Sequence, residues 1–208
     1  WASRTFRYTA LGACTTCFSV YAVGSFFAAF LQRSHGMRLG EIGLVIALIA
    51  GVGGGLATYL SGCFADRMAR RDTRWNLYIP AIAAFIPLPL APICFLSQGT
   101  TPALIAAIPI LSISAAFIGP VIATIQRLVP LRMRATSVAM LILVDNVVGL
   151  GLGPQFVGMM SDSLRPFVGV DSLRIAMLVA MAGFAVSVIG FLLAARHLRA
   201  ELASRSLN

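Results

Sequence analysis

Long stretches without a charged residue constrain this chain more than any other feature. Residues 8–32, 42–65, 76–126 and 175–195 contain no Asp, Glu, Lys or Arg, and residues 135–161 contain only Asp145. A bilayer core about 30 Å thick needs roughly 20 apolar residues in a helix. The stretch 76–126 is long enough for two such helices, with a turn at the breaker-rich segment 97–102. We therefore predict six transmembrane helices, over residues 8–31, 42–65, 76–97, 102–128, 136–160 and 175–195.

The composition agrees with a chain that lives in lipid. Hydrophobic residues make up 59% of the 208 residues and charged ones 11%, whereas a soluble domain has about 25% charged residues. This excludes an ordinary soluble enzyme, a disordered tail and a nucleic-acid module, because the net charge of +9 lies in short clusters between apolar runs. Helices are expected because no backbone group goes unpaired in lipid. The predicted fold class is an all-α polytopic membrane protein, with lipid as a partner and no nucleic acid.

The distribution of arginine predicts the orientation. All 16 basic residues are Arg; 12 lie on the side of the two termini and 4 on the other side. Positively charged loops stay in the cytoplasm, so both termini are expected there, in a bacterial inner (plasma) membrane. The first residue is Trp, and the first apolar run is far longer than the core of a signal peptide. We expect the chain to be a piece of something longer.

Asp145 is the most informative polar residue within the predicted spans. It is the tenth residue of the span counting from Thr136, roughly 15 Å deep at 1.5 Å per residue. A charge near the midplane costs about 2.5–3.5 kcal/mol on insertion scales, so Asp145, followed by Asn146, should face the bundle interior or a wet cavity. A carboxyl group there suits proton coupling or cation binding. The alternative is an interhelical hydrogen bond from a neutral acid.

Small and polar residues mark further candidate positions in the spans. Because helices in lipid pack through small residues, two GxxxG pairs indicate close helix contacts. Those pairs are Gly51 with Gly55 and Gly149 with Gly153, and Pro154 follows the second. Such contacts suit the sliding helices of a carrier, and static close packing is the alternative. Ser112 and Ser114 are expected to hydrogen-bond their own backbone.

The predicted loop between the second and third spans carries a recognisable motif. Residues 62–75 read GCFADRMARRDTRW. Gly62 would let the end of the second span approach another helix. Asp66 could face the positive N-terminus of a neighbouring helix or pair with Arg70 four residues on. Together with Arg67 and Arg71, these residues could latch cytoplasmic helix ends in one state and release them in another. The alternative is an ordinary positively charged inner loop.

This G-x-x-x-D-R-x-x-R-R pattern resembles the loop signature of the major facilitator superfamily, with Ala69 where the family commonly has Gly. Further segments are similar to Spinster-like members of that family. They are 31–43 (LQRSHGM followed by EIG), 71–81 (RDTRW followed by IPA), 129–135 (VPLRMRA), 149–162 (GLGLGP, then Gly158 and SD) and 171–174 (DSLR).

The resemblance implies the C-terminal six-helix half of a twelve-helix carrier, whose N-terminal half is missing here and would supply the other wall of the substrate site. It also implies that Tyr21 and Ser25, one turn apart in the first span, line the cavity; ordinary packing is the alternative. The implied activity is secondary active transport of a small amphipathic or anionic solute by alternating access, coupled to an ion or proton.

Other functions are less well supported by the residues. No nucleotide-binding loop is present, and no cofactor is expected. An intramembrane protease with paired aspartates is not supported, because the predicted spans contain no second midspan acid besides Asp145. Cys14 and Cys17 form a CxxC, but no His lies nearby, so we interpret them as packed small residues rather than as a metal or redox site. A stand-alone six-helix channel or a dimerising membrane subunit remains the alternative to a carrier.

Overall fold

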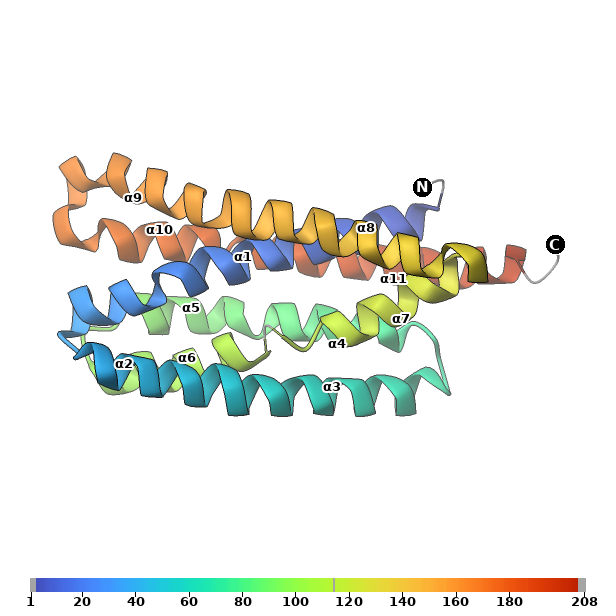
Figure 1. Cartoon of the computed structure of the whole chain (residues 1–208), viewed down its shortest axis with the longest axis horizontal. Coiled ribbons are helices and arrows are strands. Elements are labelled where there is room, and N and C mark those ends of the chain that lie inside the picture. The colour runs from blue at the N-terminus through green and yellow to red at the C-terminus, as the bar shows by residue number, and fades with distance from the viewer. Residues whose placement is uncertain (1–2, 114, 206–208) are drawn as a thin grey trace.

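The computed structural model describes residues 3–113 and 115–205 as a bundle of antiparallel helical segments (Figure 1). The first four segments are α1 (Arg4–His35), then α2 (Leu39–Ile46) continuing through η1 (Ala47–Gly53) into α3 (Gly54–Ala69), then α4 (Trp75–Phe85) with α5 (Pro87–Leu96), and α6 (Thr100–Ile113) with α7 (Ile118–Leu128). The fifth segment runs from η2 (Leu131–Met133) through α8 (Arg134–Asn146) and η3 (Val147–Leu152) into α9 (Gly153–Val168). After the short turn η4 (Gly169–Asp171), the sixth segment consists of α10 (Ser172–Ala180) and α11 (Gly183–Arg205). No strand occurs within the described ranges.

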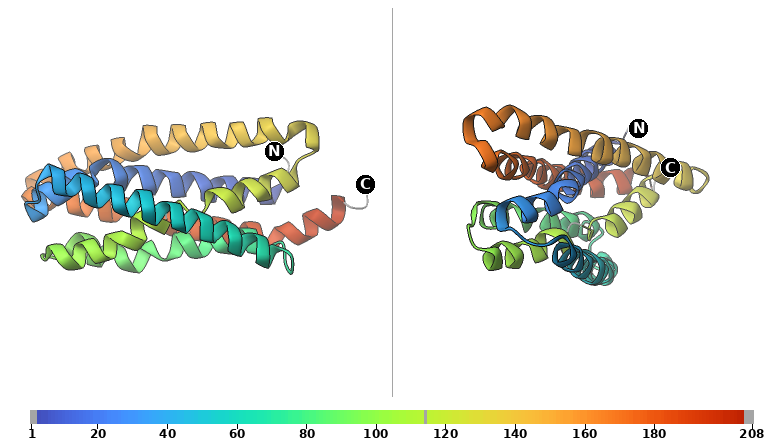
Figure 2. Two further views of the ribbon diagram at one scale, coloured as in Figure 1. Left: turned by 60° about the horizontal axis from the view of Figure 1, so that its bottom comes forward. Right: turned by 60° about the vertical axis from the view of Figure 1, so that its left-hand side comes forward.

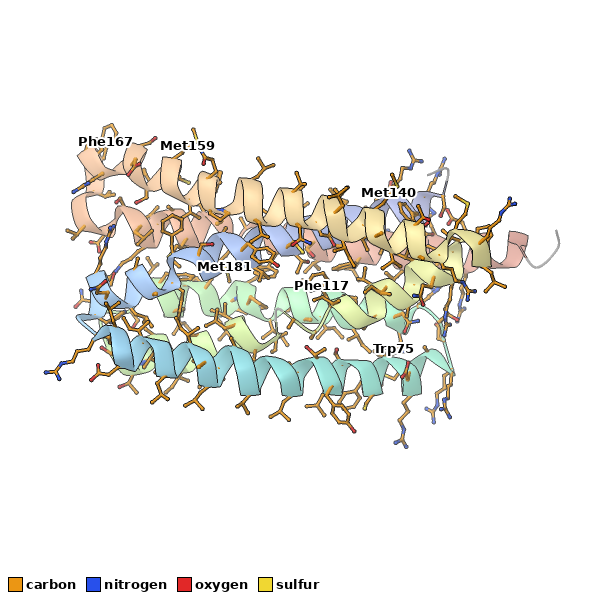
Figure 3. All side chains as sticks on the ribbon, viewed as in Figure 1. Trp75, Phe117, Met140, Met159, Phe167 and Met181 are labelled. Carbon is orange, nitrogen blue, oxygen red and sulfur yellow. The ribbon has the colours of Figure 1, made fainter. Side chains whose placement is uncertain are left out.

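Length and hydropathy mark five described segments as able to cross a membrane: Arg4–His35, Leu39–Ala69, Trp75–Leu96, Thr100–Leu128 and Leu131–Glu201. The last has 71 residues and reverses at η4, where Gly169 has φ +59°. Glycine adopts a positive φ without strain, and α9 and α10 lie antiparallel on either side of this turn as separate passes (Figure 1). Within the described residues, helical segments therefore cover each of the six predicted spans. In Figure 3, nitrogen-bearing side chains extend mainly from the two ends of the bundle, and Met140, Met159 and Phe167 lie along the outside of α8 and α9.

The central contact of the bundle joins α1 to α11. A Cβ added to Gly190 would lie 3.2 Å from the Cα of Gly12, so the two backbones touch. The Ser187 hydroxyl donates to the Gly12 carbonyl over 2.9 Å, and Ser19 donates to the carbonyl of Ala180 over 2.9 Å. Close packing of small residues and interhelical hydrogen bonds stabilise the association of helices in lipid. They hold α1 in the middle of the fold, between α11 and the helix formed by α8, η3 and α9 (Figure 2).

Two membrane segments contain a π-helical stretch, and both stretches are rich in glycine. They are η1 (Ala47–Gly53) and η3 (Val147–Leu152). The second ends immediately before Gly153 and Pro154, where the missing N–H of proline interrupts the regular ladder. A π-helical stretch widens the helix and changes which residues face its neighbours.

The segment 100–128 is also discontinuous, because α6 ends at Ile113 and α7 begins at Ile118. Irregular backbone at membrane depth needs protein or water to satisfy its polar groups. Here the second membrane segment supplies two contacts. Ser112 Oγ donates to the Ile49 carbonyl of η1 over 3.1 Å, and Thr58 Oγ1 lies 3.5 Å from the Ala115 carbonyl. The expectation that Ser112 bonds its own helix is therefore wrong, because the Ile49 carbonyl of η1 lies within reach of its hydroxyl. Ser114 lies outside the described residues.

Candidate functional site

Asp145 lies in the last turn of α8, directly before η3, and it is buried inside the bundle. Its exposed fraction is 7%, although neighbouring residues of the same helix, among them Leu143 and Val147, are well exposed. The helix therefore turns its one acid towards α1. A buried acid within a membrane segment is a functional-site candidate, because it is costly to keep there.

The partner of Asp145 is Cys14 of α1. The Cys14 thiol donates to Asp145 Oδ1 over 3.1 Å, and Cys17, one turn further along α1, lines a pocket beside Asp145. Treating these cysteines as packed small residues therefore missed a polar contact. The spacing offers a signal: Cys14, Cys17 and Tyr21 stand at positions i, i+3 and i+7, which share one helix face. In the part of the chain that the structure describes, no three His, Cys, Asp or Glu side chains are arranged to hold a metal ion.

A pocket of about 110 Å³ opens beside Asp145, between α1, α7 and α8. Its lining is mainly apolar, and the aromatic rings of Tyr21 and Phe117 contribute to it. Figure 3 shows Phe117 about midway along the bundle. The residues lining it include Cys17, Tyr21, Phe117, Val121, Leu141 and Asp145. Small-molecule sites have this character: apolar walls with few polar groups.

The other predicted pathway residues are divided by the structure. Asn146 lines the pocket, but its side-chain amide donates to the Ile142 carbonyl of its own helix over 2.8 Å. Tyr21 lines the pocket and is half-buried. Ser25 lies one turn beyond Tyr21 and is exposed, and it is not part of the pocket lining. The structure thus brings Asp145, Asn146 and Tyr21 together and leaves Ser25 apart.

The two glycine pairs have different surroundings. A Cβ on Gly153 would lie 2.8 Å from the backbone oxygen of Phe18, and one on Gly149 would lie 2.5 Å from the Tyr21 ring. Both glycines therefore bring η3 and α9 against α1, and Pro154 follows in the first turn of α9. By contrast, Gly51 and Gly55 are exposed and have no heavy atom within 4 Å of an added Cβ. Within the described chain, the glycine of that segment that touches another helix is Gly53, which lies against Ser112.

The predicted loop motif lies at the end of the bundle where α1 begins and α11 ends. Gly62 has open space around it, and Asp66, Arg67, Arg70 and Arg71 are exposed. The expected pairing of Asp66 with Arg70 is not among the ion pairs of the described residues, since α3 ends at Ala69 before a full turn separates them.

The acid of this loop that forms an ion pair is Asp72. Asp72 Oδ2 accepts from Arg199 of α11 over 2.8 Å, and its Oδ1 accepts the backbone N–H of Arg74 over 3.0 Å. The Arg74 N–H and, to a smaller extent, the Arg199 guanidinium lower the pKa of Asp72 despite a small opposing effect of burial. Two residues further along α11, Glu201 accepts from Ser3 and from the backbone N–H groups of Arg4 and Thr5 at the start of α1. The end of α11 therefore ties the loop and the start of α1 together.

The fold is a helical bundle with one buried acid, and comparisons with known proteins relate it to membrane transporters. No family model matches the chain. An MFS-type efflux pump of Mycolicibacterium smegmatis is 36% identical over 183 residues, which cover 88% of this chain and 42% of the pump.

Two solved structures share the fold: a bacterial homologue of the human lysosomal transporter Spinster in inward-facing unoccupied and occupied conformations. Both are 24% identical and match over 96% of this chain, with TM-scores of 0.85 and 0.80 over 49% and 50% of the solved chains. The chain is similar to major facilitator proteins over most of its own length and spans about half the length of these relatives. These relatives are an efflux pump and a transporter homologue, and neither is an enzyme.

Proposed function

We propose that this chain is the C-terminal six-helix half of a secondary active transporter that exports a small amphipathic solute by alternating access. The observation that carries the proposal is the buried Asp145 beside a pocket midway along a half-transporter fold. The curated relative is an efflux pump, which supports export as the direction. The arginine distribution supports placing both chain ends in the cytoplasm of a bacterial inner membrane.

An N-terminal half is the proposed partner of the second membrane segment. Only 11% of the most apolar stretch of Leu39–Ala69 is buried within this chain, compared with 44% in α1. Leu44, Leu48 and Val52 are exposed on it, as are Gly51 and Gly55. Small residues on an exposed membrane helix suit close approach by another helix. A second copy of this chain could cover the same face, which is the basis of the channel or dimer alternative.

Asp145 is proposed to couple transport to protons. Asp145 is the acid that lines the pocket. The titratable groups near it come from α1: Cys14 bonds its carboxyl group, and Cys17 and Tyr21 line the pocket. The segment around α7 adds only apolar residues to the lining, which are Phe117, Ile118, Val121 and Ile122. A carboxyl group between packed helices can gain and lose a proton as the helices part. The glycine contacts of Gly149 and Gly153 with α1 allow η3 and α9 to move against that helix without bulky side chains in the way.

Counterflow in proteoliposomes tests whether the full-length protein is a carrier. Vesicles preloaded with unlabelled solute should accumulate labelled solute transiently, and uptake should saturate. A carrier binds solute on one side at a time, so exchange is faster than net flux. Flux that rises linearly with concentration and shows no transient accumulation would instead identify a channel.

A further inference from the structure

The pocket beside Asp145 carries one formal negative charge and no positive one among its lining residues. Its other polar groups are the Tyr21 hydroxyl, the Cys17 thiol and the Asn146 amide. The amide nitrogen of Asn146 already donates one of its two hydrogen bonds to the Ile142 carbonyl. Few donors therefore remain for an anion in this half of the site.

The negative charge of Asp145 favours a cationic over an anionic solute, because the apolar lining of the pocket has a low dielectric constant. An anion placed in this pocket would meet a carboxylate without a compensating cation, and repulsion between like charges is strong where water is excluded. A cation would instead neutralise Asp145, and a charge at this depth is otherwise costly. The Cys14 thiol occupies Oδ1 of Asp145, which leaves the second oxygen for the solute.

The walls of the pocket suit a cation that carries apolar groups. Tyr21 and Phe117 contribute aromatic residues to the lining, and aromatic faces attract cations most strongly when water is removed. The remaining walls are aliphatic, from Ile118, Val121 and Leu141. The volume of about 110 Å³ is a few times the roughly 30 Å³ that a water molecule occupies in the liquid. It fits a small cationic head group, with an apolar tail extending into the rest of the transport cavity.

We propose that the Asp145 pocket is the head-group site for an amphipathic organic monocation, such as a quaternary or protonated amine. Asp145 is its counter-ion, and Cys14 is a positioning residue that orients the carboxylate. This inference rests on the proposed transporter function. It departs from the anionic solute that the Spinster-like resemblance implies, because the charge of this pocket has the opposite preference.

Two solutes with the same tail and opposite heads test the inference directly. Binding of octyltrimethylammonium and of octanesulfonate is measured by calorimetry on the full-length protein in nanodiscs, with empty nanodiscs as the background. The wild-type protein should bind the cation, and Asp145→Asn should weaken that binding by about tenfold to a hundredfold, the range typical of a lost charged contact. Octanesulfonate should bind more weakly, and Asp145→Asn should not weaken its binding, because the substitution removes a carboxylate that repels it.

Matched variants separate a lost contact from a lost fold. Asp145→Glu keeps the charge and should retain most of the affinity for the cation, and Asp162→Asn removes an exposed acid of α9 and should have no effect. Tighter binding of octanesulfonate than of the cation, or an affinity for the cation that Asp145→Asn and Asp145→Glu both leave within about twofold, would overturn the inference.

The same proteins distinguish this inference from the transporter proposal. Saturable counterflow of octanesulfonate, without counterflow of the cation, would support a carrier and refute the cation site. Binding of the cation that depends on Asp145, without counterflow of any solute, would support the site and refute the carrier.

Discussion

The Cys14 thiol donates a hydrogen bond to Asp145 Oδ1 over 3.1 Å, and this contact joins α1 to α8 beside the central pocket. Replacing Cys14 with Ala removes the donor, whereas Cys14→Ser keeps a hydroxyl in its place. We expect Cys14→Ala to lower coupled transport by about threefold to tenfold, the effect of one lost hydrogen bond, and to change its pH profile. Cys14→Ser should restore much of both.

Cys63, an exposed cysteine of α3, provides the control for that pair. Cys63→Ala should leave transport and its pH profile unchanged. Equal pH profiles in Cys14→Ala and the wild-type protein would show that the thiol does not act on Asp145.

Gly153 sets the distance between α9 and α1. An added Cβ would lie 2.8 Å from the Phe18 oxygen and 3.0 Å from the Ala22 nitrogen, both backbone atoms that cannot rotate away. Gly153→Ala should therefore cost about 1–3 kcal/mol of stability through overpacking, measured by thermal unfolding in detergent. Gly151→Ala is the matched control, because no atom lies within 4 Å of its Cβ position. Similar unfolding of the two variants would contradict the close contact.

Ser112 connects the discontinuous fourth segment to η1. Ser112→Ala removes the hydrogen bond to the Ile49 carbonyl, and we expect a loss of about 0.6 kcal/mol, the average for such bonds in membranes. Ser163→Ala removes a hydroxyl that bonds only its own helix, to the Met159 carbonyl, and should cost less. Unfolding measured side by side compares them; a larger loss in Ser163→Ala would be inconsistent with the role of Ser112.

The Asp72 and Arg199 pair should respond to acid. Folding lowers the pKa of Asp72, first through the Arg74 N–H and then through Arg199. The pair therefore stabilises the fold at neutral pH, and the stabilisation is lost as the pH falls through the lowered pKa of Asp72. Both groups are accessible to solvent, so its worth is at most about 1 kcal/mol.

A double-mutant cycle measures that pair. Asp72→Asn and Arg199→Gln should be non-additive at pH 7 and additive below the lowered pKa of Asp72. Arg196→Gln, which alters an exposed arginine of the same helix, should be additive with Asp72→Asn throughout. Additivity of the first pair at pH 7 would mean that the salt bridge contributes nothing.

Hydropathy predicted the six membrane helices because lipid tolerates few other arrangements of 20 apolar residues. The burial of Asp145 could also be predicted, since an acid at that depth must turn away from lipid. The helix against which Asp145 packs could not be predicted, because the span boundaries do not say which helix faces are in contact. Cys14 was therefore interpreted as packing.

The two GxxxG pairs show a second limit of the sequence. They look alike in the sequence, yet Gly149 and Gly153 touch α1 whereas Gly51 and Gly55 face outwards. The difference depends on tertiary neighbours and on the π-helical stretches, which rotate the faces of both helices. The loop motif shows the same limit. The motif pointed to Asp66, but the acid of that loop that forms an ion pair is Asp72, whose partner Arg199 is far away in the sequence.

The most direct test of the central claim measures coupled transport by the full-length protein with and without the Asp145 carboxylate. Solute flux driven by an imposed proton gradient is compared in wild-type, Asp145→Asn and Asp162→Asn proteoliposomes, after each protein is shown to be folded. We predict that Asp145→Asn loses gradient-driven flux and its pH dependence, while Asp162→Asn matches the wild type. Wild-type flux with wild-type pH dependence in Asp145→Asn would contradict the account.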